Sequence, residues 1–354
     1  MDKVPESAAV NESVKLAKKL TRGLSGFVNA ILRSVIREQD SIGIEDLAAN
    51  DIEAISFIYN IPLWLINLWI SEFGRDKTED LCAWFNEQPK LTARINTILI
   101  DIPQCLTMLN DQGWAVTQDS NYEDIIYINS HRGSLEKSEA FIKGYITFMD
   151  KASMLVARLV NPQPGERILD CCAAPGGKSM YMATLMDNVG SLMSCDIHEH
   201  KIELMNSNAD RLGASIVHTK VQDATKLPDS WNSYFDRVLV DAPCSGLGIL
   251  QKKLDMRWRK QESILRELPP LQLAILERAA MTVKEKGYLI YSTCTLNYKE
   301  NEEVVESFLQ KHKEFSIIPV VEDFPLKSNS GMITTYPPTD DMDGFFMVKM
   351  QRIS

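Results

Sequence analysis

Apolar side chains recur with helical spacing through the first part of the chain. They stand at every third or fourth position in two series: Val14, Ala17 and Leu20, then Phe27, Ala30, Ile31 and Val35. This spacing places them on one face of a helix. The stretch "TRGLSG" separates the series, so we predict helices over residues 11–38 with a break between them. The same helices carry six basic residues, which fit either a solvated face or a surface that contacts RNA.

Helical patterning continues over residues 45–86, where Pro62 suits the first position of a helix. From Leu91 the pattern changes. "TARINTILI" predicts a strand, "IPQCLTMLNDQGW" a helix that ends at Gly113, and "DIIYIN" another strand. These segments indicate a small α+β module.

Strand-length apolar runs dominate the rest of the chain. Five of them follow in order: "GERILDCC", "GSLMSCDI", "SIVHTKVQD", "FDRVLVDAP" and "GYLIYSTCT". Helical stretches such as "KSMYMATLMDN" separate most of them, which predicts an α/β fold with a doubly wound, mostly parallel sheet. "DGFFMVKM" predicts one late strand. We therefore divide the chain into a helical region (1–88), an α+β module (89–138) and an α/β domain (139–354).

Composition narrows the class of protein. A chain of 354 residues with 45% hydrophobic residues can form two or three ordinary cores. Its formal net charge of −10 argues against an extended non-specific nucleic-acid binder, although a local basic patch is still compatible with it.

The cysteines favour a reducing compartment. They are odd in number and include no C-x-x-C pair: Cys82, Cys105, Cys171, Cys172, Cys195, Cys244 and Cys294. Neither a disulfide framework nor a zinc site is indicated. "MDKVPESAAV" has no apolar signal core, and "IPLWLINLWI" is too short to cross a bilayer. We expect a cytoplasmic protein without a membrane partner, a metal or an evident obligate protein partner.

The stretch "ILDCCAAPGGKSMYMA" resembles a phosphate-binding loop only in part. Gly177, Lys178 and Ser179 fit the end of that pattern, but Cys172 stands where its first glycine belongs. The dinucleotide fingerprint G-x-G-x-x-G is also missing. What is left is a strand, a turn and a helix N-terminus that bring backbone N–H groups to a ligand.

Each of the five predicted strands ends in a residue with useful chemistry: Asp170, Asp196, Asp223, Asp241 and Cys294. Ligands in such sheets bind beyond the carboxyl ends of the strands, and a ribose-binding acid stands about twenty residues after the turn. Asp196 has that position. An acid placed for ribose and a turn with few anchoring charges suit S-adenosylmethionine, which has ribose and adenine but no phosphate. Asp196 would bind the ribose and Asp223 the adenine amino group, with the amino-acid end at the turn.

Three segments resemble one enzyme family: "DCCAAPGGKS", "DAPCSGLG" and "YSTCTLNYKENEEVV" are similar to the glycine-loop, Pro-Cys and Thr-Cys motifs of the RNA 5-methylcytosine methyltransferases. "VNESVKLAKKLTRGLSGFVNAILRSVIRE" resembles the end of the NusB-like domain in bacterial members that act on 16S rRNA. The resemblance implies a Rossmann-like methyltransferase domain, S-adenosylmethionine as cofactor, RNA as partner, and a partial NusB-like region with a helical linker at the N-terminus.

The resemblance also assigns roles to three residues. Cys294 would attack C6 of cytosine, Cys244 would help release the methylated product, and Asp241 would hydrogen-bond the base near N3 and the exocyclic amine. Thiolate addition at C6 makes C5 nucleophilic, and an ordinary thiol with a pKa of about 8.5 must ionise first. In the usual strand order the fourth and fifth strands are neighbours, so both cysteines could face one pocket.

The motifs imply one cofactor-binding set: Cys172, Ala173, Ala174, Pro175, Gly176, Gly177, Lys178, Asp196, Asp223 and Asp241. Lys201 stands where the family often has arginine. Other features need no special function. Buried packing explains Cys82, Cys105, Cys171 and Cys195, and Asn297 with Glu300 has helix N-cap spacing.

A basic segment, "KKLDMRWRK" (Lys252–Lys260), follows the fourth strand and is expected to contact RNA through phosphates and a stacking tryptophan. Three alternatives stay open. The same chemistry could act on tRNA or another rRNA site, or the chain could be a non-catalytic RNA-binding factor related to NusB. A nucleotide hydrolase is the weakest, because Cys172 breaks the loop pattern.

Overall fold

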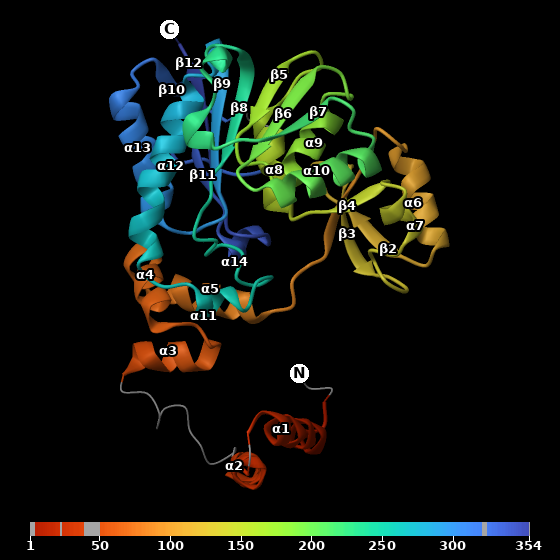
Figure 1. The fold of residues 1–354 in the computed structure, drawn as a ribbon, viewed down its shortest axis with the longest axis vertical. Coiled ribbons are helices and arrows are strands. Elements are labelled where there is room, and N and C mark those ends of the chain that lie inside the picture. The colour runs from red at the N-terminus through yellow and green to blue at the C-terminus, as the bar shows by residue number, and fades with distance from the viewer. Residues whose placement is uncertain (1–3, 22, 39–49, 321–323, 354) are drawn as a thin grey trace. The chain divides into compact units, whose positions relative to one another are not determined.

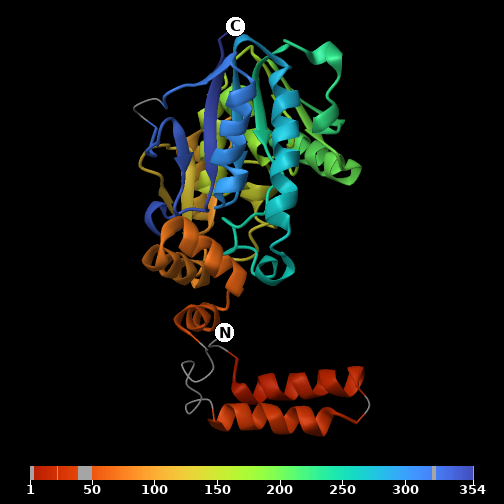
Figure 2. The ribbon, with the colours of Figure 1, turned by 90° about the vertical axis from the view of Figure 1, so that its left-hand side faces the viewer.

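The computed structural model describes residues 4–21, 23–38, 50–320 and 324–353. The chain divides into two compact units, residues 1–67 and 68–354. The first contains α1 (Glu6–Leu20) and α2 (Ser25–Glu38), which lie side by side as two antiparallel helices (Figure 2). The predicted helices and the break between them are therefore confirmed, while residues 45–49 of the next predicted stretch lie outside the described residues.

The next helices follow the predicted pattern closely. They are α3 (Asp51–Tyr59), α4 (Leu63–Phe73) and α5 (Arg75–Asn86). Pro62 precedes α4 by one position, because its carbonyl accepts the first helical bond from the Ile66 amide. Among the described residues no single helix is long and apolar enough to span a membrane, although α3 and α4, bent by 113° at their junction, together meet the length and composition criteria.

A small antiparallel sheet with strand order β2-β3-β1-β4 forms the α+β module. Its elements are β1 (Thr92–Ile95), α6 (Ile102–Asp111), β2 (Ala115–Gln118), β3 (Ile125–Ser130), α7 (Glu139–Ile142) and β4 (Ile146–Phe148). β4 lies beyond the boundary placed at residue 138, because it pairs with β1 and completes the sheet. The strand predicted over 92–100 ends at Ile95, and the Asn96 side chain instead donates to the carbonyls of Gly144 and Leu212.

The main sheet confirms the predicted α/β fold (Figure 1). Its strand order is β10-β12-β9-β8-β5-β6-β7, with β11 paired to β12. The five predicted strands are parallel: β5 (Arg167–Asp170), β6 (Ser191–Asp196), β7 (Val217–Val221), β8 (Phe235–Asp241) and β9 (Val283–Thr293). The later strands pair antiparallel: β10 (Phe315–Ile317), β11 (Met332–Thr334) and β12 (Phe346–Arg352).

Helices cover both faces of this sheet (Figures 1 and 2). One face packs against α8 (Lys151–Val160), α9 (Gly177–Leu185) and α10 (Glu199–Leu212), and the other against α12 (Ile264–Ala280) and α13 (Glu302–Lys311). Neighbouring residues in β5 show the alternation, since Ile168 joins the first core and Leu169 the second. Because β5 to β9 run parallel, the residues that end them meet at one edge of the sheet.

Candidate active site

A cavity of about 640 Å³ lies where these parallel strands end. Residues from four strand ends line it: Asp196, Asp223, Asp241, Cys244 and Cys294. The glycine turn contributes Cys172 and Ala174. The structure therefore brings the predicted cofactor carboxylates and both predicted cysteines to one space.

The turn after β5 is fixed by backbone hydrogen bonds, two of which go to the neighbouring strands β8 and β6. The amides of Cys171, Ala173 and Gly176 donate to the carbonyls of Leu239, Cys195 and Ala173. Gly176 has φ +97°, and a Cβ there would lie 3.3 Å from the side chains of Met180 and Met205. These three amides hold the turn in place, so fewer N–H groups face a ligand than the sequence suggested.

Several predicted turn residues support the cavity without lining it. Ala173 packs with Ile202 and Met205 of α10, and Gly177 follows Gly176 as the first residue of α9. Pro175 follows Ala174 through a cis peptide bond. The turn thus contributes its shape, while the polar contacts come from other residues.

Asp196 and Asp223 are each held by the loop that follows them. Asp196 Oδ1 accepts from the His198 amide at 3.0 Å, and Lys201 Nζ lies 3.6 Å away. Asp223 Oδ1 accepts from the amide and hydroxyl of Thr225 at 2.9 and 2.7 Å. These bonds hold the pKa of Asp223 below its usual value. Both carboxyl groups are held in place as acceptors for hydroxyl or amino groups.

Asp170 adds a buried carboxyl group at the foot of the turn. Burial and the nearby Asp241 raise its pKa to about 7, although Ser179 donates to Oδ2 at 2.6 Å. Its Oδ1 has no hydrogen-bond partner among the described residues. Burial and the surrounding carboxylates also raise the pKa of Cys172 well above its usual value. Carboxylates beside the turn favour a cationic ligand and disfavour a triphosphate.

Lys178 lies on the cysteine side of the cavity. Its Nζ donates to Asp241 Oδ2 at 2.6 Å, and Ser292 Oγ donates to Oδ1 at 2.8 Å. Burial alone would lower the pKa of Lys178, but Asp241 and Cys294 raise it above its ordinary value. The lysine that resembles a phosphate-loop residue is therefore an ion-pair partner of the predicted base-binding aspartate.

The two predicted catalytic cysteines are in direct contact. Their Sγ atoms lie 3.1 Å apart, beyond the length of a disulfide bond, and both thiols are free. The Cys294 amide donates to Cys244 Sγ at 3.3 Å. Hydrogen bonding to Cys294 and burial raise the pKa of Cys244 well above its usual value. Cys244 is therefore held as a neutral thiol that can donate to Cys294.

A close backbone crossing fixes the loop after Cys244. The Gly248 amide donates to the Cys294 carbonyl at 3.0 Å, and the Gly344 amide donates to the Gly248 carbonyl at 2.8 Å. A Cβ on Gly248 would lie 1.8 Å from the Gly344 carbonyl oxygen. Only glycine fits there, because the neighbouring atoms belong to the backbone.

Sequence reasoning did not identify the apolar wall of the cavity. Ile197, Ile249, Met256, Leu271 and Ile275 line it. Leu271 and Ile275 are only four positions apart in α12, which also places them in the helix's ordinary apolar pattern. Nothing in that pattern distinguishes a ring-binding leucine from a core leucine. These side chains suit the faces of an adenine or a pyrimidine.

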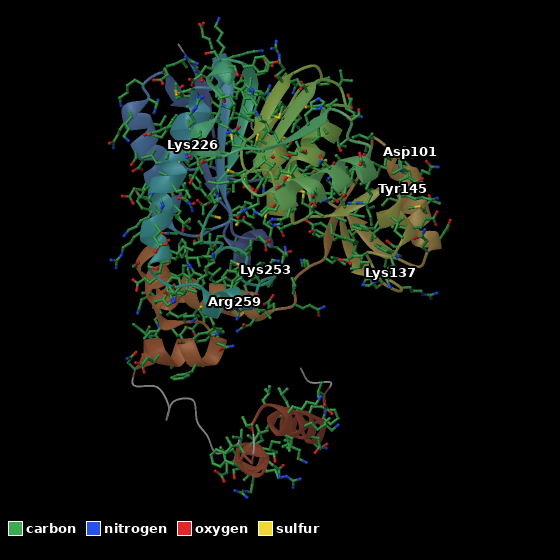
Figure 3. The ribbon with its side chains drawn as sticks, in the orientation of Figure 1. Asp101, Lys137, Tyr145, Lys226, Lys253 and Arg259 are labelled. Carbon is green, nitrogen blue, oxygen red and sulfur yellow. The ribbon has the colours of Figure 1, made fainter. Side chains whose placement is uncertain are left out.

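The basic segment contributes fewer RNA-facing groups than its composition suggested. Lys252 pairs with Asp150 and Asp343, and the buried Arg257 donates to Phe85 and Asn86. Both side chains therefore form bonds within the fold. Trp258 is 59% exposed, and Lys253 and Arg259 also reach the surface (Figure 3). Met256 between them lines the cavity, so this exposed group adjoins the site.

Four further cysteines are buried, and one of them, Cys171, also lines the cavity. Cys82, Cys105, Cys171 and Cys195 are buried, and burial raises the pKa of each thiol. Within the described part of the chain, no three His, Cys, Asp or Glu side chains are grouped to hold a metal ion.

Comparison with known proteins decides the family. The model of the 16S rRNA methyltransferase RsmB/F family matches residues 157–351. The chain belongs to the RsmB/F family. Residues 61–133 match the ferredoxin-like domain of RsmF/B-like methyltransferases, and residues 1–37 match the NusB family. The resemblance and fold predicted from the sequence are thus confirmed, and the chain is an S-adenosylmethionine-dependent rRNA methyltransferase.

Relatives cover nearly all of this RsmB/F-family chain. The probable ribosomal RNA small subunit methyltransferase B of Bacillus subtilis is 36% identical over 99% of the chain and 79% of its own length. The Synechocystis protein of the same name is 37% identical over 99% of the chain and 80% of its own length. The crystal structure of PH0851 has a TM-score of 0.87 and 28% identity over 98% of the chain and 77% of its own length.

The residues present fit the cofactor of this family. S-adenosylmethionine carries a sulfonium and an ammonium group, and the carboxyl groups of Asp196 and Asp223 line the cavity. Asp196, Asp223 and the apolar wall from α12 suit ribose and adenine.

Proposed function

We propose that this chain forms 5-methylcytosine in 16S rRNA through a covalent bond between Cys294 and C6 of the target cytosine. The observation that carries the proposal is the contact between Cys244 and Cys294, with sulfur atoms 3.1 Å apart, in the cavity that also holds Asp196 and Asp223. Packing alone does not explain two thiols inside a cofactor cavity, because cysteines buried elsewhere in the fold would pack equally well.

Each step of the chemistry has a residue beside it. The Cys294 thiolate adds to C6, which makes C5 electron-rich enough to accept a methyl group. S-adenosylmethionine, when bound, supplies that methyl group from its sulfonium. The proton at C5 then passes to the Cys244 sulfur, once that thiol has lost its own proton to solvent. The bond between C6 and sulfur breaks, and the Cys294 thiolate is restored. Cys244, whose sulfur touches that of Cys294, is the neighbouring acid–base group for release.

Asp241 and Lys178 would hold the base. Asp241 has both oxygens fixed by Lys178 and Ser292, so it can accept from the exocyclic amine with its position already set. Lys178 places a positive charge beside the ring and the attacking sulfur. Such preorganised charges stabilise the negative charge that develops in the ring. The turn residues and Asp196 and Asp223 would bind the cofactor.

The names of the relatives favour small-subunit rRNA over tRNA as substrate. The segment with Trp258, Lys253 and Arg259 would contact RNA beside the cavity, because an exposed tryptophan can stack on a base that leaves its helix. The division into residues 1–88, 89–138 and 139–354 stays a prediction. The small sheet runs to Phe148, which lies beyond the second boundary.

The first test replaces Cys294 by alanine. Cys294→Ala should lower methylation by at least about 1,000-fold, because the attacking sulfur is removed, while S-adenosylmethionine binds as before. Cofactor affinity is measured by calorimetry and methylation by bisulfite sequencing of 16S rRNA and tRNA. Cys105→Ala, a buried cysteine of the small module, is the control and should keep activity. Retained activity in Cys294→Ala would remove Cys294 as nucleophile, and methylation of tRNA alone would reject the 16S assignment.

A further inference from the structure

Glu300 is a carboxylate buried beneath the cysteine pair, with none of its surface exposed. Its Oε1 accepts from Ser245 Oγ at 2.5 Å and from Asn297 Nδ2 at 2.8 Å. Its Oε2 accepts from the Ser245 amide at 2.8 Å and from Gln272 Nε2 at 2.9 Å. Four neutral donors satisfy the acceptor capacity of one ionised carboxylate, and none of them is a cation.

The four donors come from three distant segments of the chain. Ser245 directly follows Cys244, Asn297 follows Cys294 by three positions, and Gln272 lies in α12. Ser245 Oγ also contacts Thr295 Oγ1 at 2.7 Å. The carboxylate therefore ties the loop of one cysteine to the loop of the other.

The expected role of Glu300 as part of a helix N-cap does not explain these contacts. Asn297 caps the 3₁₀ turn η5 (Tyr298–Glu300) by accepting from the Lys299 amide, and it does so without Glu300. The Glu300 side chain bonds to Asn297, but it also bonds to Ser245 and Gln272, which the cap does not require. A buried anion costs free energy, and a polar group of similar size would satisfy fewer donors at lower cost. The presence of a carboxyl group rather than a neutral polar group at this position therefore needs an explanation.

Charges of opposite sign flank the two sulfur atoms. The negative charge of Glu300 adds to hydrogen bonding and burial in raising the pKa of Cys244. Lys178 lies close enough to Cys294 that a thiolate there raises the pKa of Lys178. The raised pKa disfavours a thiolate at Cys244, although the bond from the Cys294 amide lowers that pKa in part, and Lys178 places a positive charge near Cys294.

We propose that Glu300 is a positioning residue that assigns the two cysteines their different roles. Its carboxylate fixes the spacing of the two loops and keeps the shared proton on Cys244, so that Cys294 carries the nucleophilic charge. This inference rests on the proposed covalent mechanism, but its physical content, unequal ionisation of two touching thiols, can be measured without RNA.

The test compares Glu300→Gln with Glu303→Gln, an exposed glutamate three positions away. The purified proteins are treated with limiting iodoacetamide, and initial alkylation rates at Cys294 and Cys244 are measured by peptide mass spectrometry. The parent protein should react faster at Cys294. In Glu300→Gln the ratio of the Cys294 rate to the Cys244 rate should fall about tenfold, which corresponds to one pKa unit of relative thiol ionisation. Glu303→Gln should leave that ratio unchanged.

Kinetics provide the second measurement. Glu300→Gln should lower kcat about tenfold while KM for S-adenosylmethionine stays within a factor of about two, because Asp196 and Asp223 are untouched. If Glu300→Gln does not bind the cofactor, Ser245→Ala replaces it, since it removes one donor and keeps the backbone bond to Glu300. It should shift the alkylation ratio in the same direction by a smaller factor.

The results separate this inference from the proposed function. An unchanged alkylation ratio in Glu300→Gln overturns the positioning role, even where Cys294→Ala has abolished methylation. A lowered ratio supports it, even where Cys294→Ala stays active and the nucleophile has to be sought elsewhere. A loss of kcat without any change in the ratio reduces Glu300 to a structural tie and also overturns the proposal.

Discussion

The two halves of the cavity are built in different ways. On the cofactor side, Asp196 bonds to His198 and Asp223 to Thr225, each two residues further along the chain. On the cysteine side, Cys244 contacts Cys294 fifty residues away, and Ser245 bonds to Glu300. The first half depends on local turns, whereas the second exists only after distant segments have met.

This difference suits the tasks of the two halves. A cofactor needs acceptors with the right chemistry, and carboxyl groups held by the loops that follow them provide these acceptors. A nucleophile needs a sulfur with a defined neighbour and charge, which tolerates little displacement. We therefore expect substitutions on the cofactor side to change affinity, and those on the cysteine side to change the rate of the chemical step.

The largest separation of the two halves is expected from Cys244→Ala. Methylation should fall about 100-fold, the usual contribution of an acid–base group, while cofactor affinity is unchanged. Because release is impaired and attack is not, a covalent protein–RNA species should accumulate. It is detected as a slow-migrating band on denaturing gels that requires S-adenosylmethionine and disappears in Cys244→Ala/Cys294→Ala. The absence of that band would reject this division of labour.

A smaller effect, confined to affinity, is expected from Asp223→Ala. Loss of a charged acceptor for the cofactor costs about 1.5 kcal/mol, or about tenfold in Kd. Titration calorimetry measures the Kd, and iodoacetamide reactivity of Cys294 should not change. Asp229→Ala, a nearby aspartate whose side chain is 94% exposed, is the matched control and should bind normally. Altered Cys294 reactivity in Asp223→Ala would show that the two halves are coupled.

The smallest effect concerns a single hydrogen bond and its dependence on pH. Thr225→Val removes the hydroxyl that lowers the pKa of Asp223 below its ordinary value of 3.8. A carboxyl group whose pKa is lower in the folded state stabilises the fold at pH values above its pKa in the unfolded state. That stabilisation is lost as the pH falls through its pKa in the folded state. The variant should therefore be about 0.5 kcal/mol less stable at neutral pH, with the difference fading below about pH 4.

Urea unfolding across that pH range measures the difference. Thr107→Val removes a hydroxyl bond to the Pro103 carbonyl, where no carboxylate is involved, so its effect should not depend on pH. A pH-independent loss in Thr225→Val would mean that the hydroxyl does not act through Asp223.

The sequence predicted the local features and one long-range feature, the shared cavity of Cys244 and Cys294, but it did not reveal the other long-range contacts. Asp196 and Asp223 follow from strand ends and spacing, and the parallel strands follow from apolar runs. Lys178 was assigned to the cofactor set because its neighbours in sequence form the turn, but its partner is Asp241, 63 residues away. Glu300 has helix-cap spacing, and only the fold shows that its carboxylate reaches Ser245. No local pattern carries such information.

Composition misled for a related reason. "KKLDMRWRK" indicates a basic patch, yet Lys252 and Arg257 are used inside the fold. β4 was not predicted because three residues give too short a pattern, and its identity comes from pairing with β1. Charge counts and short apolar runs give the composition of a segment, whereas its contacts within the fold determine what its residues do.

The crossing of Gly248 and Gly344 limits how this enzyme can diverge. The atoms that a side chain at Gly248 would meet are the carbonyl oxygen, the carbonyl carbon and the Cα of Gly344. Every amino acid supplies those atoms, so no codon change at position 344 can make room for a new side chain at position 248. Substitutions that improve the pocket must therefore occur at other positions, because a second substitution at position 344 cannot compensate for a side chain at position 248.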